Sequence, residues 1–514
     1  MMLNSAPTQE RMWFIIKVPP YRPIPQIDLY GIDRANQNTE TFTDDVKKQN
    51  PTLGDQFMKN QIHFAPLIIC LLTLLTFNGT IRAKQTVKSQ KQPNILFLFT
   101  DDQRFDTIHA LGNPQIKTPH FDKLVQNGFT FNNTYCMGSW CGAVCLPSRT
   151  MVMTGRTLWR IPRRNEKVSA KFRATTLPAV LKRAGYVTYR TGKGGNTFKP
   201  ANDEFDYNTS IDTRDPFSSK NHTERAMKFL RSHKGDVPFY IHMAFAKPHD
   251  PRVAPPEYMK MYDPNQILLP RNFLPQHPFD NGELRIRDEM LAPFPRSPEI
   301  MRQHIADYYA CITYLDVQIG RILKTLEECG FAGNTIVVFS SDQGLAVGGQ
   351  HGLMGKQNLY ECNKPPLIFT GPGIPHGKSD ALVYLHDLYP TFCELAGIVL
   401  PGFVEGESLW PIIKGKKAKI RNWIFGAYKD CQRMIRDRRW KLIKYNAEGV
   451  KNKQLFDLKN DPDEINNLAH QTKYAEHLDR LEKLLIEARR LAGDPDDFDR
   501  TSNGKKPQGQ SGGT

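Results

Sequence analysis

The sequence predicts an α/β fold in which helices flank a mainly parallel central sheet and a smaller antiparallel sheet lies near the C-terminus. Two short apolar runs, residues 94–100 and 335–341, are typical of strands that are buried on both faces. Between them, residues 176–185 and 298–330 carry apolar side chains at helical spacing, and this alternation favours a parallel sheet. After Pro411 the pattern changes to short strand-like pieces with turns between them.

These patterns divide the chain into segments. We expect a main domain over residues 92–410 and a C-terminal subdomain over residues 411–493, in which a helix at 473–492 closes the small sheet. Residues 494–514 are rich in Gly, Lys, Ser and Gln, so we predict that they form a disordered tail.

The N-terminal part has the layout of an export signal. Residues 64–77 form the only long apolar run, and these fourteen residues are too few for a membrane span, which needs about 20. Because Lys59 precedes the run and polar residues follow it, we interpret residues 58–83 as a signal peptide and residues 1–57 as an over-extended gene start. We therefore predict an exported protein, periplasmic or extracellular, with no stable membrane span after cleavage. A buried core helix or an uncleaved anchor is the alternative.

Composition and charge narrow the class of partner. Of the 514 residues, 39% are hydrophobic and 24% are charged, which is near the average for globular proteins. Lys and Arg outnumber Asp and Glu by 69 to 53, and the net charge of +16 favours polyanionic partners. The basic residues are spread along the chain without a zinc-finger or RRM pattern, so we predict no nucleic-acid partner. An acidic substrate explains the charge equally well, as does a basic surface without a partner.

Nine cysteines lack the density and regular spacing of a disulfide scaffold. Cys136, Cys141 and Cys145 match neither the paired spacing of zinc sites nor the usual iron–sulfur runs. We interpret Cys136 and Cys141 as buried thiols or as one local disulfide.

Carboxylates follow both predicted core strands. Asp101 and Asp102 come after the first strand, and Asp342 with Gln343 comes after the second. In open α/β sheets, ligands bind at the carboxyl ends of the strands. Carboxylate and amide oxygens suit a hard cation such as calcium or magnesium, whereas thiolates and imidazoles would suit zinc. Either acidic pair alone could also be a helix cap or an Asx-turn.

The segment from Cys145 to Arg149 reads Cys-Leu-Pro-Ser-Arg and is followed by Thr154-Gly155. It resembles the C-x-P-S-R-x4-T-G signature of the type I sulfatases, the formylglycine-dependent, cysteine-type branch of the alkaline phosphatase superfamily, which includes arylsulfatases and iduronate-sulfatase-like bacterial polysaccharide sulfatases. Every fixed position is present, and related motifs extend over roughly residues 92–470. The resemblance implies an alkaline-phosphatase-like fold, and it makes the main domain a catalytic sulfatase domain.

The resemblance also implies a cofactor set. Cys145 would be oxidised to formylglycine by a separate maturation enzyme, and it would lie beside one calcium or magnesium ion. The proposed ligands of this ion are Asp101, Asp102, Cys145, Asp342 and Gln343. Relatives often carry Asn or His at the position of Gln343. The Gln343 side chain is a variant that still offers a carbonyl oxygen as a ligand.

Four further residues receive roles by the same resemblance. Arg149 would steady the hydrated aldehyde, and Lys193 and Lys356 would bind the sulfate group. His249, in a Lys-Pro-His segment, is a candidate proton donor to the departing alcohol. Read without the family, each Lys could be a solvated surface residue and His249 could cap a turn.

One position departs from the family. Many relatives carry a His shortly after the Lys193 motif, where it helps remove the second proton of the hydrated aldehyde, but here the residues are Gly194, Gly195 and Asn196. Asn196 can hydrogen-bond but cannot take up a proton at neutral pH. Either His351 or a metal-bound group replaces the missing base, or the enzyme is slow or has drifted in its chemistry.

We therefore predict a sulfuric ester hydrolase that acts on a sulfated carbohydrate. One alternative is a phosphonate monoester or phosphodiester hydrolase of the same superfamily. The segments around His249 and Lys356 favour a sulfatase over this alternative. The other is a catalytically weak, polyanion-binding homologue, which the basic charge and the missing His favour.

Overall fold

The computed structural model describes residues 92–211, 214–447, 450–494 and 498. The predicted N-terminal extension, 1–57, and the predicted signal peptide, 58–83, lie outside the described residues. Within these ranges, none of the helices combines the length and the apolarity that a membrane crossing requires.

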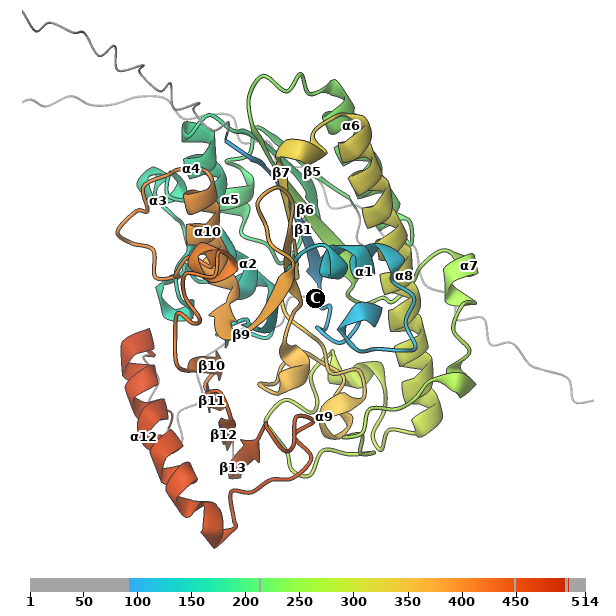
Figure 1. Ribbon diagram of the computed structural model, residues 1–514. Coiled ribbons are helices and arrows are strands. Elements are labelled where there is room, and N and C mark those ends of the chain that lie inside the picture. Colours follow the sequence, from blue (N-terminus) through green and yellow to red (C-terminus); the bar gives the residue numbers. More distant parts are fainter. Residues whose placement is uncertain (1–91, 212–213, 448–449, 495–497, 499–514) are drawn as a thin grey trace, which may run out of the picture. The chain divides into compact units, whose positions relative to one another are not determined.

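A mostly parallel, eight-stranded sheet forms the centre of the described fold (Figure 1). Its strand order is β5-β4-β6-β1-β7-β8-β2-β9, and only β8 runs antiparallel to its neighbours. The strands are β1 (Asn94–Asp101), β2 (Phe129–Tyr135), β4 (Val187–Gly192), β5 (Tyr207–Ser210), β6 (Phe239–Pro248), β7 (Thr335–Ser341), β8 (Leu367–Thr370) and β9 (Gly377–Tyr384). The two predicted core strands are β1 and β7, and they pair with each other in parallel.

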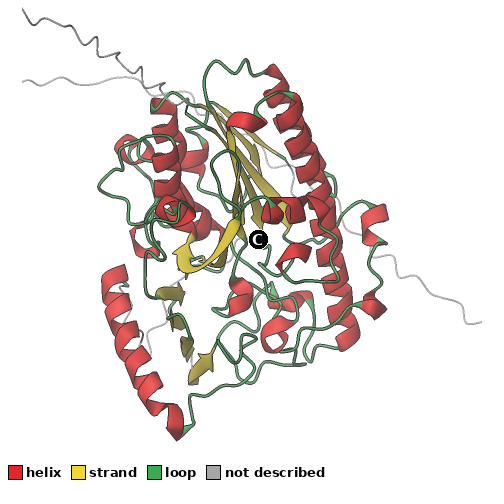
Figure 2. Cartoon of the chain, in the orientation of Figure 1, coloured by secondary structure: helices red, strands yellow, loops and turns green. Residues whose placement is uncertain are grey.

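Helices cover both faces of this sheet, as Figure 2 shows. On one face lie α1 (Pro119–Gln126), α6 (Ser218–Ser232) and α8 (Pro298–Glu328). On the other face lie α2 (Cys145–Thr154), α4 (Leu177–Arg183) and α10 (Leu388–Leu395). The shorter helices are α3 (Ala170–Arg173), α5 (Lys199–Asn202), α7 (Pro256–Met259), α9 (Gly349–Gly352) and α11 (Trp410–Ile413). The predicted fold class is thereby confirmed.

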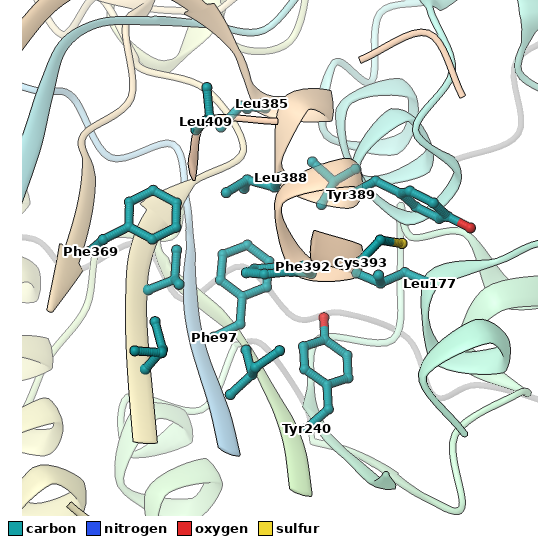
Figure 3. Packing of buried hydrophobic residues seen from close by; sticks show 14 of the residues in the cluster. Phe97, Leu177, Tyr240, Phe369, Leu385, Leu388, Tyr389, Phe392, Cys393 and Leu409 are labelled. Atoms are coloured by element: carbon teal, nitrogen blue, oxygen red, sulfur yellow. The ribbon is translucent and has the colours of Figure 1, made fainter. Parts of the chain in front are cut away.

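A hydrophobic core lies on each face of the main sheet, because successive side chains of β1 point to opposite faces. Phe97 points into the cluster shown in Figure 3, where it packs with Phe392 of α10, whereas Leu96 and Leu98 belong to the cluster under α8. Every β1 residue is buried, and residues 95–99 in the middle of the strand are all apolar. The carboxylates Asp101 and Asp102 follow at its carboxyl end.

A second, five-stranded sheet lies in the C-terminal part, with the order β13-β12-β11-β10-β3. Its strands are β3 (Gly138–Ser139), β10 (Ile424–Tyr428), β11 (Gln432–Arg436), β12 (Trp440–Ala447) and β13 (Val450–Asp457), and α12 (Ala475–Ala492) packs against it. Strands β10 to β13 are antiparallel, as predicted, but β3 joins β10 in parallel from the main domain. Only Gly fits at 138, where φ is +113° and a Cβ atom would overlap the carbonyl of Ala427.

Residues 494 and 498 of the predicted tail belong to the described part of the chain. The Asp494 side chain is buried and forms ion pairs with Arg433 at 2.6 Å and Arg489 at 3.0 Å. Phe498 is 3% exposed. A carboxylate held between two guanidinium groups fixes Asp494 against β11 and α12.

Candidate active site

Four neighbouring parallel strands each end at residues that the sequence predicts for the site. In the sheet they are ordered β4-β6-β1-β7, so their carboxyl ends lie side by side. The residues at these ends are Lys193 after β4, His249 after β6, Asp101 and Asp102 at β1, and Asp342 and Gln343 after β7. Parallel pairing thus brings together side chains that are far apart in the sequence.

Helix α2 adds Cys145 at its first turn and is fixed to the same strand ends. Ser148 Oγ donates a hydrogen bond to the carbonyl oxygen of Asp342 at 2.5 Å. One residue further, Arg149 Nε donates to Asp342 Oδ2 at 2.9 Å, and Arg149 Nη2 donates to the carbonyl of Thr100 at 3.1 Å. These bonds explain the fixed Ser and Arg of the signature, because both hold the start of α2 against β1 and β7.

Cys145 lies within a compact group of acids. Its Sγ is 3.1 Å from Asp101 Oδ1 and 3.9 Å from Asp102 Oδ1. Together with Asp342, each of these residues offers one ligand atom, and all four atoms lie within 4.8 Å of one another. Cys145 itself is 1% exposed, and its thiol marks the place where the proposed formylglycine would stand.

The acids and the amide fit a hard cation. Gln343 Nε2 contacts Asp102 Oδ1 at 2.5 Å and Cys145 Sγ at 3.2 Å, while Gln343 Oε1 is buried without a hydrogen-bond partner in the described part of the chain. Turning the amide by 180° would place that oxygen beside the carboxylates, and the two orientations are a choice of assignment. The resulting set of oxygen ligands suits calcium or magnesium.

The pKa shifts of the acidic residues also favour a bound cation. Burial, together with the nearby Asp101 carboxylate, raises the pKa of Asp342. Burial would also raise the pKa of Asp101, but Lys193, His249 and Arg149 hold it well below its usual range. The site therefore keeps negative charge in a buried place, where a divalent cation would offset the repulsion.

Two lysines border the acids. Lys193 Nζ contacts Asp101 Oδ2, and Lys356 Nζ donates to Asp102 Oδ2 at 2.8 Å. Burial would lower the pKa of both amines, but the carboxylates raise the pKa of Lys193, and that of Lys356 well above its usual range. Both side chains are buried and charged, so neither is a solvated surface lysine.

His249 lies at the more accessible edge of this group. Its side chain is 20% exposed, and its Nε2 is 3.7 Å from Asp102 Oδ2. Its Nδ1 is 2.7 Å from the carbonyl of Asp250, which can only accept a hydrogen bond. Nδ1 therefore carries a proton, and Nε2 is the nitrogen that faces the acidic cluster.

The structure places His351 among other aromatic rings. The His351 ring packs against the rings of His277 and Tyr360, with centroids 5.9 and 5.8 Å away, rather than against Cys145. At Gly195, by contrast, a Cβ atom would meet no atom within 4 Å. Gly194, Gly195 and Asn196 are all exposed, so the segment that departs from the family lies at the surface.

Sequence reasoning missed one charged residue of the site. Asp288 Oδ2 is 3.8 Å from Lys356 Nζ and accepts a hydrogen bond from Gln357 at 2.9 Å. It lies in an irregular segment with no spacing pattern, so no motif could have indicated it. Cys136 and Cys141 are free, half-buried thiols, which excludes the local disulfide in this structure.

Family comparisons agree with this geometry. The family described as Sulfatase matches residues 93–398, which is more than half of the chain. A second family, described as N-sulphoglucosamine sulphohydrolase, C-terminal, matches residues 349–491.

Individual relatives are similar over most of their length. The chain is 25% identical to an N-acetylglucosamine-6-O-sulfatase of Bacteroides thetaiotaomicron, and the match covers 83% of this chain and 91% of the relative. A solved structure in complex with its substrate D-glucosamine-2-N,6-O-disulfate superposes with a TM-score of 0.68 at 25% identity, over 80% of this chain and all of that one. A phosphonate monoester hydrolase of Agrobacterium radiobacter shares the fold, with a TM-score of 0.64 at 21% identity, over 78% of this chain and 96% of that one.

Proposed function

The chain belongs to the sulfatase family, and from this premise we propose that it removes sulfate from a sulfated carbohydrate outside the cytoplasm, with a formylglycine made from Cys145 and one calcium or magnesium ion. One observation carries the proposal: the Cys145 side chain stands among three buried carboxylates that two buried lysines border. The carbohydrate is inferred from the names of similar proteins, which include the N-acetylglucosamine-6-O-sulfatase and an ulvan-active sulfatase of Formosa agariphila.

The proposed cofactors supply the nucleophile. Formylglycine would provide a hydrated aldehyde, and the bound cation would lower the pKa of its hydroxyl and polarise the sulfate group. Asp101, Asp102, Asp342 and Gln343 would hold the ion. Arg149 lies between Asp342 and Asp101, at 2.9 and 3.8 Å, so it would steady the hydroxyl groups at position 145.

The lysines and His249 have separate tasks. The Lys193 and Lys356 ammonium groups are fixed and buried, so they would stabilise the negative charge on the sulfate oxygens without reorganising. His249 is less buried and its Nε2 faces the acids, so it would give a proton to the alcohol oxygen as the S–O bond breaks. We propose these roles for Lys193, Lys356 and His249 together.

Phosphonate ester hydrolysis is the second candidate, because a phosphonate monoester hydrolase shares the fold. Rates on an aryl sulfate and an aryl phosphonate separate the two activities, and we expect the aryl sulfate to be cleaved faster. The reverse order would assign the site to phosphonate esters. Tight binding of a sulfated glycan without turnover, despite formylglycine at position 145, would instead identify a binding protein.

The decisive experiment is mass spectrometry of the peptide that contains Cys145, after production in a host with a maturation system. We expect the mass of formylglycine, and we expect Cys145→Ala to abolish turnover while the fold is kept. Cys141→Ala is the matched control, because Cys141 is a free thiol whose Sγ contacts Ser139 and Ala143 rather than the acids. Full activity with an unmodified thiol at position 145 would refute the mechanism.

A further inference from the structure

The loop that follows α2 concentrates positive charge on the surface. Residues 156–173, here called the basic loop, contain seven basic side chains and one acidic side chain, Glu166. The basic side chains are Arg156, Arg160, Arg163, Arg164, Lys167, Lys171 and Arg173. This density exceeds that of the chain as a whole, whose basic residues are spread along its length.

Part of this charge is already neutralised or covered. Arg160 pairs with Glu405 at 2.5 Å and Arg173 pairs with Glu204 at 2.8 Å, while Arg156 lies over an aromatic ring.

The other four basic side chains are exposed. They are Arg163, Arg164, Lys167 and Lys171. In the part of the chain that the structure describes, none of these four side chains forms an ion pair with a carboxylate. Even after Glu166 is counted, the basic loop presents a clear excess of positive charge.

Arg163 is held in a defined position. Its guanidinium carbon lies 5.4 Å from the ring centroid of Trp140 and 5.4 Å from that of Trp159. Contacts of this kind restrict the guanidinium without using its N–H groups. A stacked Arg therefore suits planar, two-point recognition of an anionic group such as sulfate.

A hollow accompanies the exposed charge. Its volume is about 460 Å³, and Arg163, Lys167, Ser169, Trp159 and Phe172 are among its lining residues. This volume lies within the range of small-ligand sites. Cations, a hydroxyl group and aromatic rings together provide the contacts that a sulfated sugar requires.

The basic loop contacts the chain segment that leads into Cys145. Trp140, which contacts Arg163, lies five residues before Cys145, a stretch that spans at most about 18 Å. Two residues after Trp140, the carbonyl of Gly142 accepts a hydrogen bond from Gln357, the neighbour of Lys356. One polymeric substrate could thus reach both places.

We propose that the basic loop is a second binding surface, which holds an anionic unit of a sulfated polysaccharide while another unit of the same polymer occupies the site at Cys145. The inference rests on the proposed function for the identity of the polymer. It makes the loop a determinant of preference for polymers over small esters.

The test compares two triple variants with equal loss of charge. The loop variant is Arg163→Gln, Arg164→Gln and Lys167→Gln, and the control is Lys416→Gln, Lys417→Gln and Lys419→Gln, whose lysines are exposed after α11. With a sulfated polysaccharide that the enzyme cleaves, we expect the loop variant to raise KM about tenfold with kcat unchanged, and the control to change KM less than about twofold. With an aryl sulfate both variants should match the parent, and the difference on the polymer should shrink at high salt. Equal effects of the two variants would overturn the proposal.

A binding measurement separates this inference from the proposed function. Heparin serves as the probe, and the same triple substitutions are placed in the Cys145→Ala protein, so that turnover plays no part. We expect weaker heparin binding only for the loop variant, and this result would support the surface even if no sulfate ester were cleaved. Undiminished heparin binding by a loop variant with an unchanged melting temperature would overturn it. Arg163→Lys keeps the charge, and a partial loss would assign the effect to the stacked guanidinium.

Discussion

Three carboxylates and one amide converge on Cys145, although like charges repel in a buried place. Burial raises the pKa of Asp342, whereas the lysines and Arg149 hold that of Asp101 low, so the cluster still carries charge near neutral pH. Burying a charged side chain away from water costs free energy unless an opposite charge lies beside it. A divalent cation is the partner that this set of oxygens would bind best.

Removal of the metal should therefore stop catalysis. We expect a chelator to inactivate the enzyme and calcium or magnesium to restore it. Asp342→Asn should lower metal affinity by at least about tenfold, because it removes a proposed ligand. Asp288→Asn is the control, since Asp288 contacts Lys356 and Gln357 rather than the acids. Metal content is measured by mass spectrometry of the purified proteins. If Asp342→Asn kept its metal and its activity, the ion would have to bind elsewhere.

His249 and Lys356 should respond differently to the leaving group. A sugar alkoxide needs a proton as it departs, whereas a nitrophenolate leaves largely unaided, so His249→Ala should slow sugar-sulfate turnover by about 10²–10⁴ and nitrophenyl-sulfate turnover far less. Lys356→Ala should slow both to a similar extent, because Lys356 would hold sulfate oxygens that both substrates share. Steady-state kcat on the two substrates gives the comparison. Equal losses for His249→Ala would make His249 a sulfate binder instead.

The sequence predicts those residues of the candidate site that belong to a short motif or directly follow an apolar run. Cys145 and Arg149 belong to such a motif, and Asp101 and Asp342 follow such runs. Asp288 could not be chosen, because it comes from an irregular segment and only the folded chain brings it to Lys356.

At the scale of elements, the site depends on how α6 and the strands are packed. His222 of α6 is buried, and its Nδ1 lies 2.9 Å from Thr191 Oγ1 in β4, two residues before Lys193. Burial, with smaller contributions from Arg190 and Arg225, lowers the pKa of His222 to about 3. This imidazole is therefore neutral in the folded protein over most of the acidic range.

The neutral His222 makes folding stability depend on pH. Between pH 3 and about 6.5 the unfolded chain binds a proton at this position and the folded protein does not, so its contribution rises with pH and is lost as the pH falls. His222→Gln should reduce the slope of unfolding free energy by up to about 1.4 kcal/mol per pH unit in this window. Urea unfolding at several pH values measures it. His109→Gln is the control, because the His109 ring is exposed. Parallel slopes for His222→Gln and the parent would contradict this account.

The strength of the sequence signal decided which elements could be predicted. The long helix α8 starts after Ser297, whose side chain accepts a hydrogen bond from Ile300, and its apolar spacing is regular over its whole length. Strands β1 and β7 are buried throughout and each has an apolar middle, residues 95–99 and 336–339. In contrast, β3 has two residues and exists only because Gly138 lets the chain approach β10, so no periodicity could indicate it.

At the scale of the whole described molecule, a buried ion network joins the C-terminal sheet to the active-site loops. Lys441 of β12 lies 3.2 Å from Glu361 and 2.9 Å from Glu464. Glu361 comes five residues after Lys356 and also accepts a hydrogen bond from Tyr135 at 2.8 Å. The C-terminal sheet thus helps to hold the loop that carries a proposed sulfate-binding lysine.

Breaking this network should cost stability. Lys441→Met removes the cation that pairs with the buried Glu464, whereas Glu361 keeps Lys364 at 3.1 Å and Arg436 at 3.6 Å. Because a buried carboxylate loses its partner, we expect a loss of about 3–5 kcal/mol in unfolding free energy. Lys453→Met is the matched control, since Lys453 is 37% exposed and pairs with Glu482 at 3.4 Å, and it should cost less than about 1 kcal/mol. Denaturant unfolding compares the two. Similar small losses would show that the network contributes little.

The burial of Cys145 has a consequence for the order of events in the life of the protein. A side chain that is 1% exposed at the start of a helix cannot enter the active site of another protein. The proposed oxidation must then take place on a chain that has not yet folded, so modification and folding are in competition from synthesis onward. Under the proposed mechanism, a molecule that folds first would keep its thiol and would be inactive for its lifetime. The specific activity of a preparation would accordingly report how often modification preceded folding, even when every molecule is correctly folded.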